Sequence, residues 1–351
     1  MAGSRASALR TFVIRRLLLM IPTMLGISLF VFLLCQFVPG GPIDQLRLQM
    51  AGGGAQGEVS SGRGSGVPTN EIPPEQLAVL EAYYGFDKPI YQRYFMYVKN
   101  LATLNLGESQ RYLVPVTDLI KQRMPISLFF GLITTILTYS ICIPLGIVKA
   151  LRHRSVFDNT SSALIFIGYA IPNYALGAVL LVLFSVKKDW FPLSGFVSPG
   201  YADFGTLQKI TDLAQHAFLP LICLTIGSFA FMTMLLKNSL MDNMGADYVK
   251  TALAKGMTWR RAIFVHALRN SLIPMATSFG NIISLLVVGF LLIERVFGIH
   301  GIGLLFFDAM QARDYPLIMG ITVVSSALLL IGNLLSDLTV ALVDPRVRFG
   351  E

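Results

Sequence analysis

Charged residues and cysteines are scarce in this chain. Only 14% of its 351 residues are Asp, Glu, Lys or Arg, whereas a typical soluble protein carries roughly 25%. This low charge argues against a globular cytosolic enzyme. The three cysteines, Cys35, Cys142 and Cys223, all lie inside apolar stretches. They offer neither a disulfide framework nor a CxxC metal site, so we interpret them as small buried apolar side chains.

The sequence also lacks the motifs of a catalytic site. No GxxxxGK[ST] segment that would cradle nucleotide phosphates occurs, and Lys255-Gly256 has the reverse order. The four histidines stand singly, without a second ligand at metal spacing, at His153, His216, His266 and His300. No nucleophile has a plausible base. These absences predict that the chain is not an enzyme, holds no metal and binds no cofactor itself.

Apolar residues are abundant and occur in blocks. They make up 54% of the chain, and the mean hydropathy is +0.63. Six uncharged blocks reach the roughly 20 residues that a helix needs to cross a bilayer. They run over Leu17–Val38, Pro125–Val148, Asn159–Val186, Ala217–Leu236, Ser271–Ile293 and Tyr315–Ser336. Since backbone polar groups cannot stay unpaired in lipid and no strand-like alternation is present, we predict an all-α integral membrane protein with six transmembrane helices.

The distribution of basic residues predicts the topology. Lys and Arg gather before the first block, after the second block at 149–154, and in the long loop 237–270. Cytoplasmic loops carry such an excess, and six crossings return the C-terminus to the same side. The first block is too long for a signal peptide, so we expect it to be retained. The formal net charge of +8 thus reflects topology at a lipid bilayer and predicts no nucleic-acid partner.

Three regions follow from this reading. Residues 1–38 form the cytoplasmic N-terminus and first helix, 39–124 an external segment, and 125–351 a five-helix core with the cytoplasmic loop 237–270. In the external segment, residues 51–68 are rich in Gly and Ser and predict a flexible loop, with a specific binding role left open. Two short amphipathic helices are expected over Glu75–Tyr84 and Tyr91–Leu104. They lie on the membrane rim or pack against the other helices.

The loop 237–270 contains a complete short helix. Asp247 is a candidate for its N-terminal cap, Lys255 stands near its end, Gly256 follows, and Thr258 is a candidate cap for a second helix. An isolated helix shorter than about 12–15 residues is marginal in water. This helix therefore needs a surface, which either a partner protein or the chain's own membrane helices could supply.

At this loop the chain resembles the inner-membrane permeases of bacterial ABC importers, in the B-type subunits of the dipeptide, oligopeptide and nickel permease family. Their cytoplasmic "EAA" loop matches Ala252–Gly256 and the run from His266 to Pro274, with Lys250-Thr251-Ala252 at the EAA positions. Seven further segments resemble motifs of this family: Arg15–Leu19, Pro39–Pro42, Tyr84–Pro89, Leu106–Ser109, Glu294–Gly303, Arg313–Pro316 and Asp344–Arg346. The Gly-rich insertion and Gly168–Pro172 look most like the YejB-type branch, which is associated with peptides and peptide-like antibiotics of the microcin C kind.

The resemblance implies a type I importer permease fold that forms half of a translocation path. It implies a second related permease, two ATPase subunits that bind ATP and Mg, and an external binding protein that delivers the peptide. The ATPase-coupling residues would be Asp247, Tyr248, Lys250, Ala252, Leu253, Lys255, Gly256, Asn270 and Pro274. For the binding protein, two outer loops that mix Gly with large apolar residues are candidates: their residues are Trp190, Phe196, Phe297, Ile299 and Gly301. Packing of these loops on the domain's own rim is the alternative.

An ion-coupled secondary transporter is the main alternative function. It would place ionisable residues near the middle of the membrane. The six blocks contain none, and Glu294 and Asp337 fall at block ends. Composition leaves a receptor or scaffold open, but such a protein would not explain a docking helix between the fourth and fifth blocks. We therefore favour the importer permease.

Overall fold

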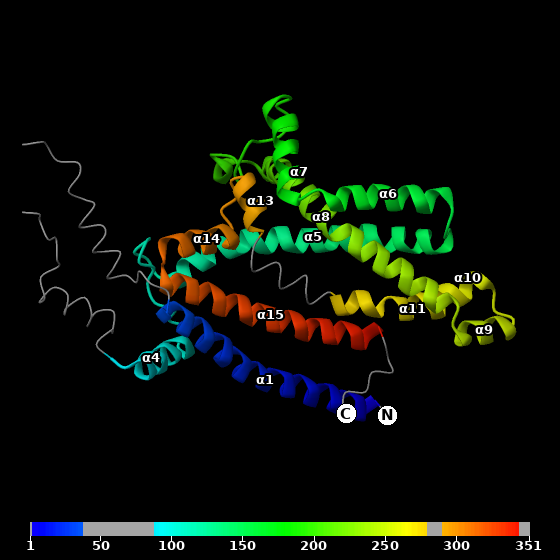
Figure 1. Ribbon diagram of the computed structural model, residues 1–351, viewed down its shortest axis with the longest axis horizontal. Coiled ribbons are helices and arrows are strands. Elements are labelled where there is room, and N and C mark those ends of the chain that lie inside the picture. Colours follow the sequence, from blue (N-terminus) through cyan, green and yellow to red (C-terminus); the bar gives the residue numbers. More distant parts are fainter. Residues whose placement is uncertain (1, 38–87, 279–289, 344–351) are drawn as a thin grey trace, which may run out of the picture. The chain divides into compact units, whose positions relative to one another are not determined.

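The computed structural model describes residues 2–37, 88–278 and 290–343 (Figure 1). Across these ranges the regular structure is helical, apart from one isolated β-bridge between Glu108 and Pro115. The predicted all-α class is confirmed. Several sequence predictions lie outside the described residues: the Gly-rich loop, the helix over Glu75–Tyr84, the segment Pro39–Pro42, the middle of the fifth block and the C-terminal motif Asp344–Arg346.

Four helices are long and apolar enough to span a bilayer: α1 (Ala2–Phe37), α5 (Val116–Leu151), α8 (Thr206–Met244) and α15 (Tyr315–Val343). They contain the second, fourth and sixth apolar blocks and the first block up to Phe37. With 39 residues, α8 is about 58 Å long at 1.5 Å per residue. The hydrocarbon core of a bilayer is about 30 Å thick. The helix α8 can therefore cross the membrane and still extend beyond it.

The third apolar block is broken, so it does not form the single continuous helix that the sequence predicted. It forms α6 (Val156–Ala170), α7 (Asn173–Leu180) and a π-helical turn, η2 (Leu181–Val186), with a 90° bend between α6 and α7. Pro172 causes the break because it lacks an N–H and disfavours helical backbone at Ile171, which is extended with φ −86° and ψ 123°.

The fifth block is described only at its two ends. The short helix α11 (Leu268–Ser271) and a helical stretch at 273–278 precede the undescribed part, and α13 (Leu291–Val296) follows it. The described residues thus contain four helices that are long and apolar enough to span a bilayer, or five if the bent α6–α7 pair counts as one span. The predicted number of six is not established by them.

The chain divides into two compact units. One comprises residues 22–120 and 306–323, and the other residues 1–21, 121–305 and 324–351. In the first of these units, α4 (Ile90–Ala102) confirms the helix predicted from Tyr91 onwards. Tyr94 and Tyr97 of α4 pack against Phe32 of α1, whereas Tyr91 and Phe95 remain exposed. One face of this amphipathic helix is therefore a protein contact and the other is open.

The same unit joins two of the sequence motifs that carried the family resemblance. The Ser109 hydroxyl and the Arg111 backbone N–H both donate to the Asp314 carboxylate, and Asp314 in turn accepts from the N–H of Leu317 in the first turn of α15. Asp314 is fully buried. A carboxylate at a helix N-terminus satisfies free N–H groups there and interacts favourably with the helix dipole.

The larger unit is organised around α8. At the first half of α8, Leu219 and Cys223 pack with Phe130 of α5 and Ile293 of α13. At its last turns, Leu240 packs with Ala150 of α5 and with the helices that follow. Figure 1 shows α7 and α13 beside the first half of α8, whereas the short helices α9 (Asp247–Ala254) and α10 (Trp259–Ala262) lie beyond its C-terminal end. The predicted outer loops and the predicted coupling loop therefore lie at different positions along this one helix.

Candidate functional site

The predicted coupling loop folds into a set of short helices after α8. These are α9 (Asp247–Ala254), α10 (Trp259–Ala262), the π-helical η4 (Ile263–Ala267) and α11. The N-terminal cap of α9 is Ala246, so the prediction of Asp247 as the cap is wrong. Asp247 is instead the first helical residue and accepts a 2.9 Å bond from Lys250. This hydrogen bond lowers the pKa of Asp247, which keeps a negative charge near the helix N-terminus.

The C-terminal end of α9 agrees with the sequence prediction. Gly256 has φ +85°, a left-handed conformation that glycine adopts without steric cost. Its N–H donates to the carbonyl of Leu253 at 2.9 Å, and the N–H of Met257 donates to that of Ala252 at 3.2 Å. This pair of bonds is a Schellman motif, which ends the helix and reverses the chain. Thr258 then occupies the cap position of α10 as predicted, but its side chain makes no capping hydrogen bond.

One face of α9 is anchored on the chain's own helices. Val249 and Ala252 are buried in a cluster that includes Ala150 of α5, Leu240 of α8 and Ile263 of η4. Of the predicted coupling residues, Ala252 is thus 8% exposed and contributes mainly to internal packing. The opposite face of α9 is exposed, with Asp247, Lys250, Thr251, Ala254 and Lys255. The helix therefore uses its own membrane helices as one surface and leaves the other open.

A pocket of about 860 Å³ lies between the C-terminal end of α9 and the helices that follow it. Five of the predicted coupling residues contribute to its lining: Tyr248, Ala252, Lys255, Gly256 and Asn270. The other four do not. Asp247 and Lys250 lie on the exposed face of α9, while Leu253 and Pro274 are half-buried elsewhere. The sequence pattern thus located the pocket, although it did not separate lining residues from supporting ones.

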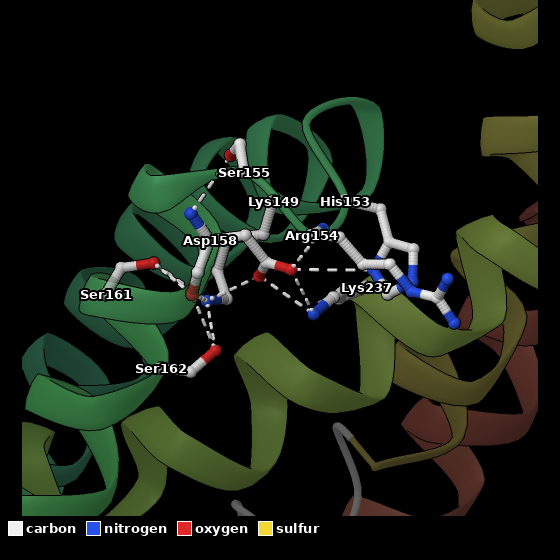
Figure 2. Close-up of polar contacts among 8 residues, drawn as sticks. All are labelled: Lys149, His153, Arg154, Ser155, Asp158, Ser161, Ser162 and Lys237. Carbon is white, nitrogen blue, oxygen red and sulfur yellow. Dashed lines mark hydrogen bonds and ion pairs between the residues drawn. The ribbon is translucent and has the colours of Figure 1, made fainter.

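Sequence reasoning missed a buried ionic cluster beside this loop. Figure 2 shows Lys149 from α5, Asp158 from α6 and Lys237 from α8 converging on one point. Both Asp158 carboxylate oxygens lie 2.8 Å from the Lys237 ammonium, and one lies 3.0 Å from that of Lys149. All three residues are buried: Lys237 is 8% exposed, Asp158 is 2% exposed and Lys149 is 0% exposed. The two lysines were counted as loop cations that set the topology, but they belong to the protein interior.

The hydrogen bonds around the cluster explain how three charges can be buried together. Besides the carboxylate, Lys149 donates to the hydroxyls of Ser161 and Ser162 at 2.8 and 2.7 Å. Asp158 also accepts from the backbone N–H of Arg154 at 3.1 Å. Buried charges are tolerated when they are paired and hydrogen-bonded. The cluster therefore ties the start of α6 to α5 and to α8, a few turns before α8 leads into α9.

Comparison with known proteins identifies the chain. Residues 142–349 match the family model described as "Binding-protein-dependent transport system inner membrane component". The chain belongs to this family. It is 38% identical to the "Peptidoglycan transport system permease protein YejB" of Agrobacterium fabrum, across 96% of this chain and 98% of that protein. It is also 33% identical to the "Dipeptide transport system permease protein DppB" of Escherichia coli K12, across 96% of this chain and 98% of that protein.

A second YejB relative, the "Inner membrane ABC transporter permease protein YejB" of Escherichia coli O157:H7, is also 38% identical over 96% of this chain. These findings confirm the resemblance to ABC peptide permeases and to their YejB-like branch. The protein is a membrane permease subunit with several apolar helices.

In this permease the outer-loop residues proposed to contact a binding protein differ in exposure. Trp190 is 58% exposed, with the Lys188 ammonium 4.4 Å from the centre of its ring. Phe196 is half-buried and stacks edge-on against Phe129 and Phe130. Phe297 and Ile299 are buried in the cluster around α8 and α13. These two residues therefore pack on the permease's own helices, which is the alternative that the sequence left open.

Gly301 is also buried, and its role is to make room for Glu294. A Cβ atom at Gly301 would overlap the Glu294 carboxylate and the Ser127 hydroxyl. Glu294 accepts from the N–H of Leu304 at 2.7 Å, in the first turn of α14 (Ile302–Ala312), and from Ser127 at 3.3 Å. The loop 297–301 is therefore closed over a buried carboxylate. The position of Glu294 at the end of an apolar block gave no sign of this contact.

Proposed function

We propose that this permease forms one half of the translocation path of an ATP-driven importer for peptides or peptide-like compounds. The observation that carries the proposal is α9, which has one face anchored on α5 and α8 and the other face exposed beside a pocket. When a protein docked on its exposed face moves, such a helix can displace the membrane helices that pack against its buried face. The YejB and DppB relatives, named as permeases of peptidoglycan and dipeptide transport systems, support a peptide substrate.

The proposed assembly contains a second, related permease and two ATPase subunits that hold ATP and Mg and carry out the hydrolysis. An external binding protein would deliver the substrate, with Trp190 as a contact. Closure of the ATPases on ATP would move α9 and, through the buried packing around Leu240 and Ala150, would tilt α8 and α5. Peptide-like antibiotics of the microcin C kind are candidate substrates within this class.

Reconstitution tests the transport function. We expect the permease, co-expressed with the second permease and the ATPase subunits, to give proteoliposomes that accumulate a labelled oligopeptide when ATP and the binding protein are both supplied. The matched control carries an ATPase that binds but does not hydrolyse ATP, and it should show no uptake. Uptake by this chain alone, driven by a proton or sodium gradient, would establish the ion-coupled alternative.

The proposal includes a topology in which both termini and α9 are cytoplasmic. Single cysteines introduced by Ala202→Cys and Thr251→Cys, in a background without the three native cysteines, place an exposed thiol near each end of α8. In intact spheroplasts, an impermeant maleimide should label the first variant and leave the second unlabelled until the membrane is permeabilised. The reverse pattern would invert the topology, and labelling of both from outside would contradict a span through α8.

A further inference from the structure

The pocket beside α9 is lined by basic side chains and lacks acidic ones. Lys255, Arg261, His266 and Arg269 contribute to it, and none of the described residues that line it is Asp or Glu. Tyr248, Met257 and Val265 provide less polar parts of the wall. The acidic residue on α9, Asp247, is at the opposite end of the helix and already binds Lys250. The pocket therefore concentrates positive charge.

Two of these cations have no internal partner. Lys255 and Arg261 are exposed, and neither forms an ion pair or side-chain hydrogen bond with any other residue in the described ranges. By contrast, the buried lysines 149 and 237 of the same unit are paired with Asp158. Leaving a cation unpaired at the surface costs little free energy, because water solvates it. When a carboxylate replaces that water, the cation gains a strong, charge-assisted hydrogen bond.

We infer that this pocket receives an acidic side chain of the ATPase subunit, with Lys255 and Arg261 binding its carboxylate. The inference rests on the proposed function and adds to it the chemistry of the partner surface: an Asp or Glu that protrudes from the ATPase and is flanked by apolar groups. The turn at Gly256 leaves access for it, since no atom of the surrounding structure lies within 4 Å of the position that a Cβ would occupy there.

The shape of the site favours a protein over a membrane surface. A bilayer is planar, and it attracts basic residues that are spread along a face. Here the cations converge on a concave pocket, which a protruding side chain can enter. The apolar part of the lining matches the less polar neighbours that surround a charged anchor at the centre of a protein interface.

Charge reversal in the assembled complex tests the inference. The variants are Lys255→Glu, Arg261→Glu and their combination, and the control is Arg260→Glu, which is adjacent and exposed but does not line the pocket. The measurement is the dissociation constant of the purified ATPases for the permease pair in nanodiscs, at low and high salt. We expect the double variant to bind about tenfold more weakly or worse at low salt and with a reduced salt dependence, whereas Arg260→Glu changes binding by less than about twofold.

The outcomes separate the inference from the proposed function. If the wild-type permease binds no ATPase, the proposed function fails. If it binds and the double variant binds equally well, the pocket does not recognise an acidic group. If the double variant keeps its ATPases but its nanodiscs require less phosphatidylglycerol for stability, a lipid headgroup is the ligand, and the inference is overturned. Recovery of binding on reversal of one acidic ATPase residue to Lys would confirm the pairing.

Discussion

The Asp158→Asn variant is expected to lose about 3–5 kcal/mol of stability, the cost of removing one member of a buried ionic group. Asparagine can still accept hydrogen bonds, but it leaves the ammonium groups of Lys149 and Lys237 facing each other without a counter-charge. Water can replace little of the lost counter-charge, since Lys149 has no exposed surface and Lys237 is only 8% exposed. The measurement is thermal unfolding of the detergent-purified permease, together with the fraction that elutes as a monodisperse species.

A matched control is available on the same helix as Lys237. Asp242→Asn removes an equal charge from an exposed position of α8 and should change stability by less than about 1 kcal/mol. The triple variant Lys149→Met, Asp158→Asn, Lys237→Met should recover much of the loss, because a neutral buried cluster needs no counter-charge. Unfolding of Asp158→Asn at the wild-type temperature would falsify the assignment of the cluster as a structural tie.

The Gly256→Pro variant is expected to remain inserted in the membrane but to lose uptake by about tenfold or more. Proline requires φ near −65° and has no N–H, whereas Gly256 has φ +85° and donates to Leu253. A mismatch of about 3 kcal/mol is enough to make the reversed turn a minor state. The helix α9 then no longer ends beside the pocket, and ATP hydrolysis is uncoupled from transport.

The other end of the same loop supplies the comparison. Gly245, just after α8, has a φ of −79°, which any residue can adopt. A Cβ atom at this position would lie 3.6 Å from the carbonyl oxygen of Asp242, an ordinary van der Waals distance. Gly245→Ala should therefore transport at close to the wild-type rate, while Gly256→Ala should be intermediate, because the left-handed conformation costs a residue with a Cβ roughly 1–2 kcal/mol. Binding-protein-stimulated ATPase activity and peptide uptake, measured on the same proteoliposomes, distinguish uncoupling from loss of assembly. Wild-type uptake by Gly256→Pro would show that the turn is not part of the coupling route.

Two buried carboxylates of the larger unit, Asp158 and Glu294, differ from those of an ion-coupled transporter in their surroundings. Asp158 is bound by two lysines, and Glu294 accepts from a backbone N–H in the first turn of α14 and from the Ser127 hydroxyl of α5. Each lies at the end of an apolar block and not within it. Their contacts account for their burial as ties between helices, and we place neither on a proton or sodium pathway.

The amino-acid sequence alone determined the membrane class, the positions of four spanning helices and the end of α9 at Gly256. These features depend on local chemistry: long uncharged runs can be satisfied in lipid only as helices, and a glycine after a short amphipathic segment permits the left-handed turn. The family resemblance, carried by short motifs in order along the chain, was confirmed by the comparisons. The break at Pro172 was also encoded locally, but the apolar run around it concealed it.

Only the tertiary structure decided which charges and which residues of the predicted outer loops are buried. Lys149 and Lys237 look like ordinary loop cations, and 79 residues separate Lys237 from Asp158, so no periodic pattern could pair them. From the sequence, Phe297 and Ile299 look like parts of an exposed apolar loop. In the structure, Glu294 binds the N–H of Leu304 in α14, and both residues are buried in a cluster with residues of α8 and α13. In each instance the partner lies far away in the chain or on another helix, and burial depends on contacts between elements that the pattern of any single segment does not contain.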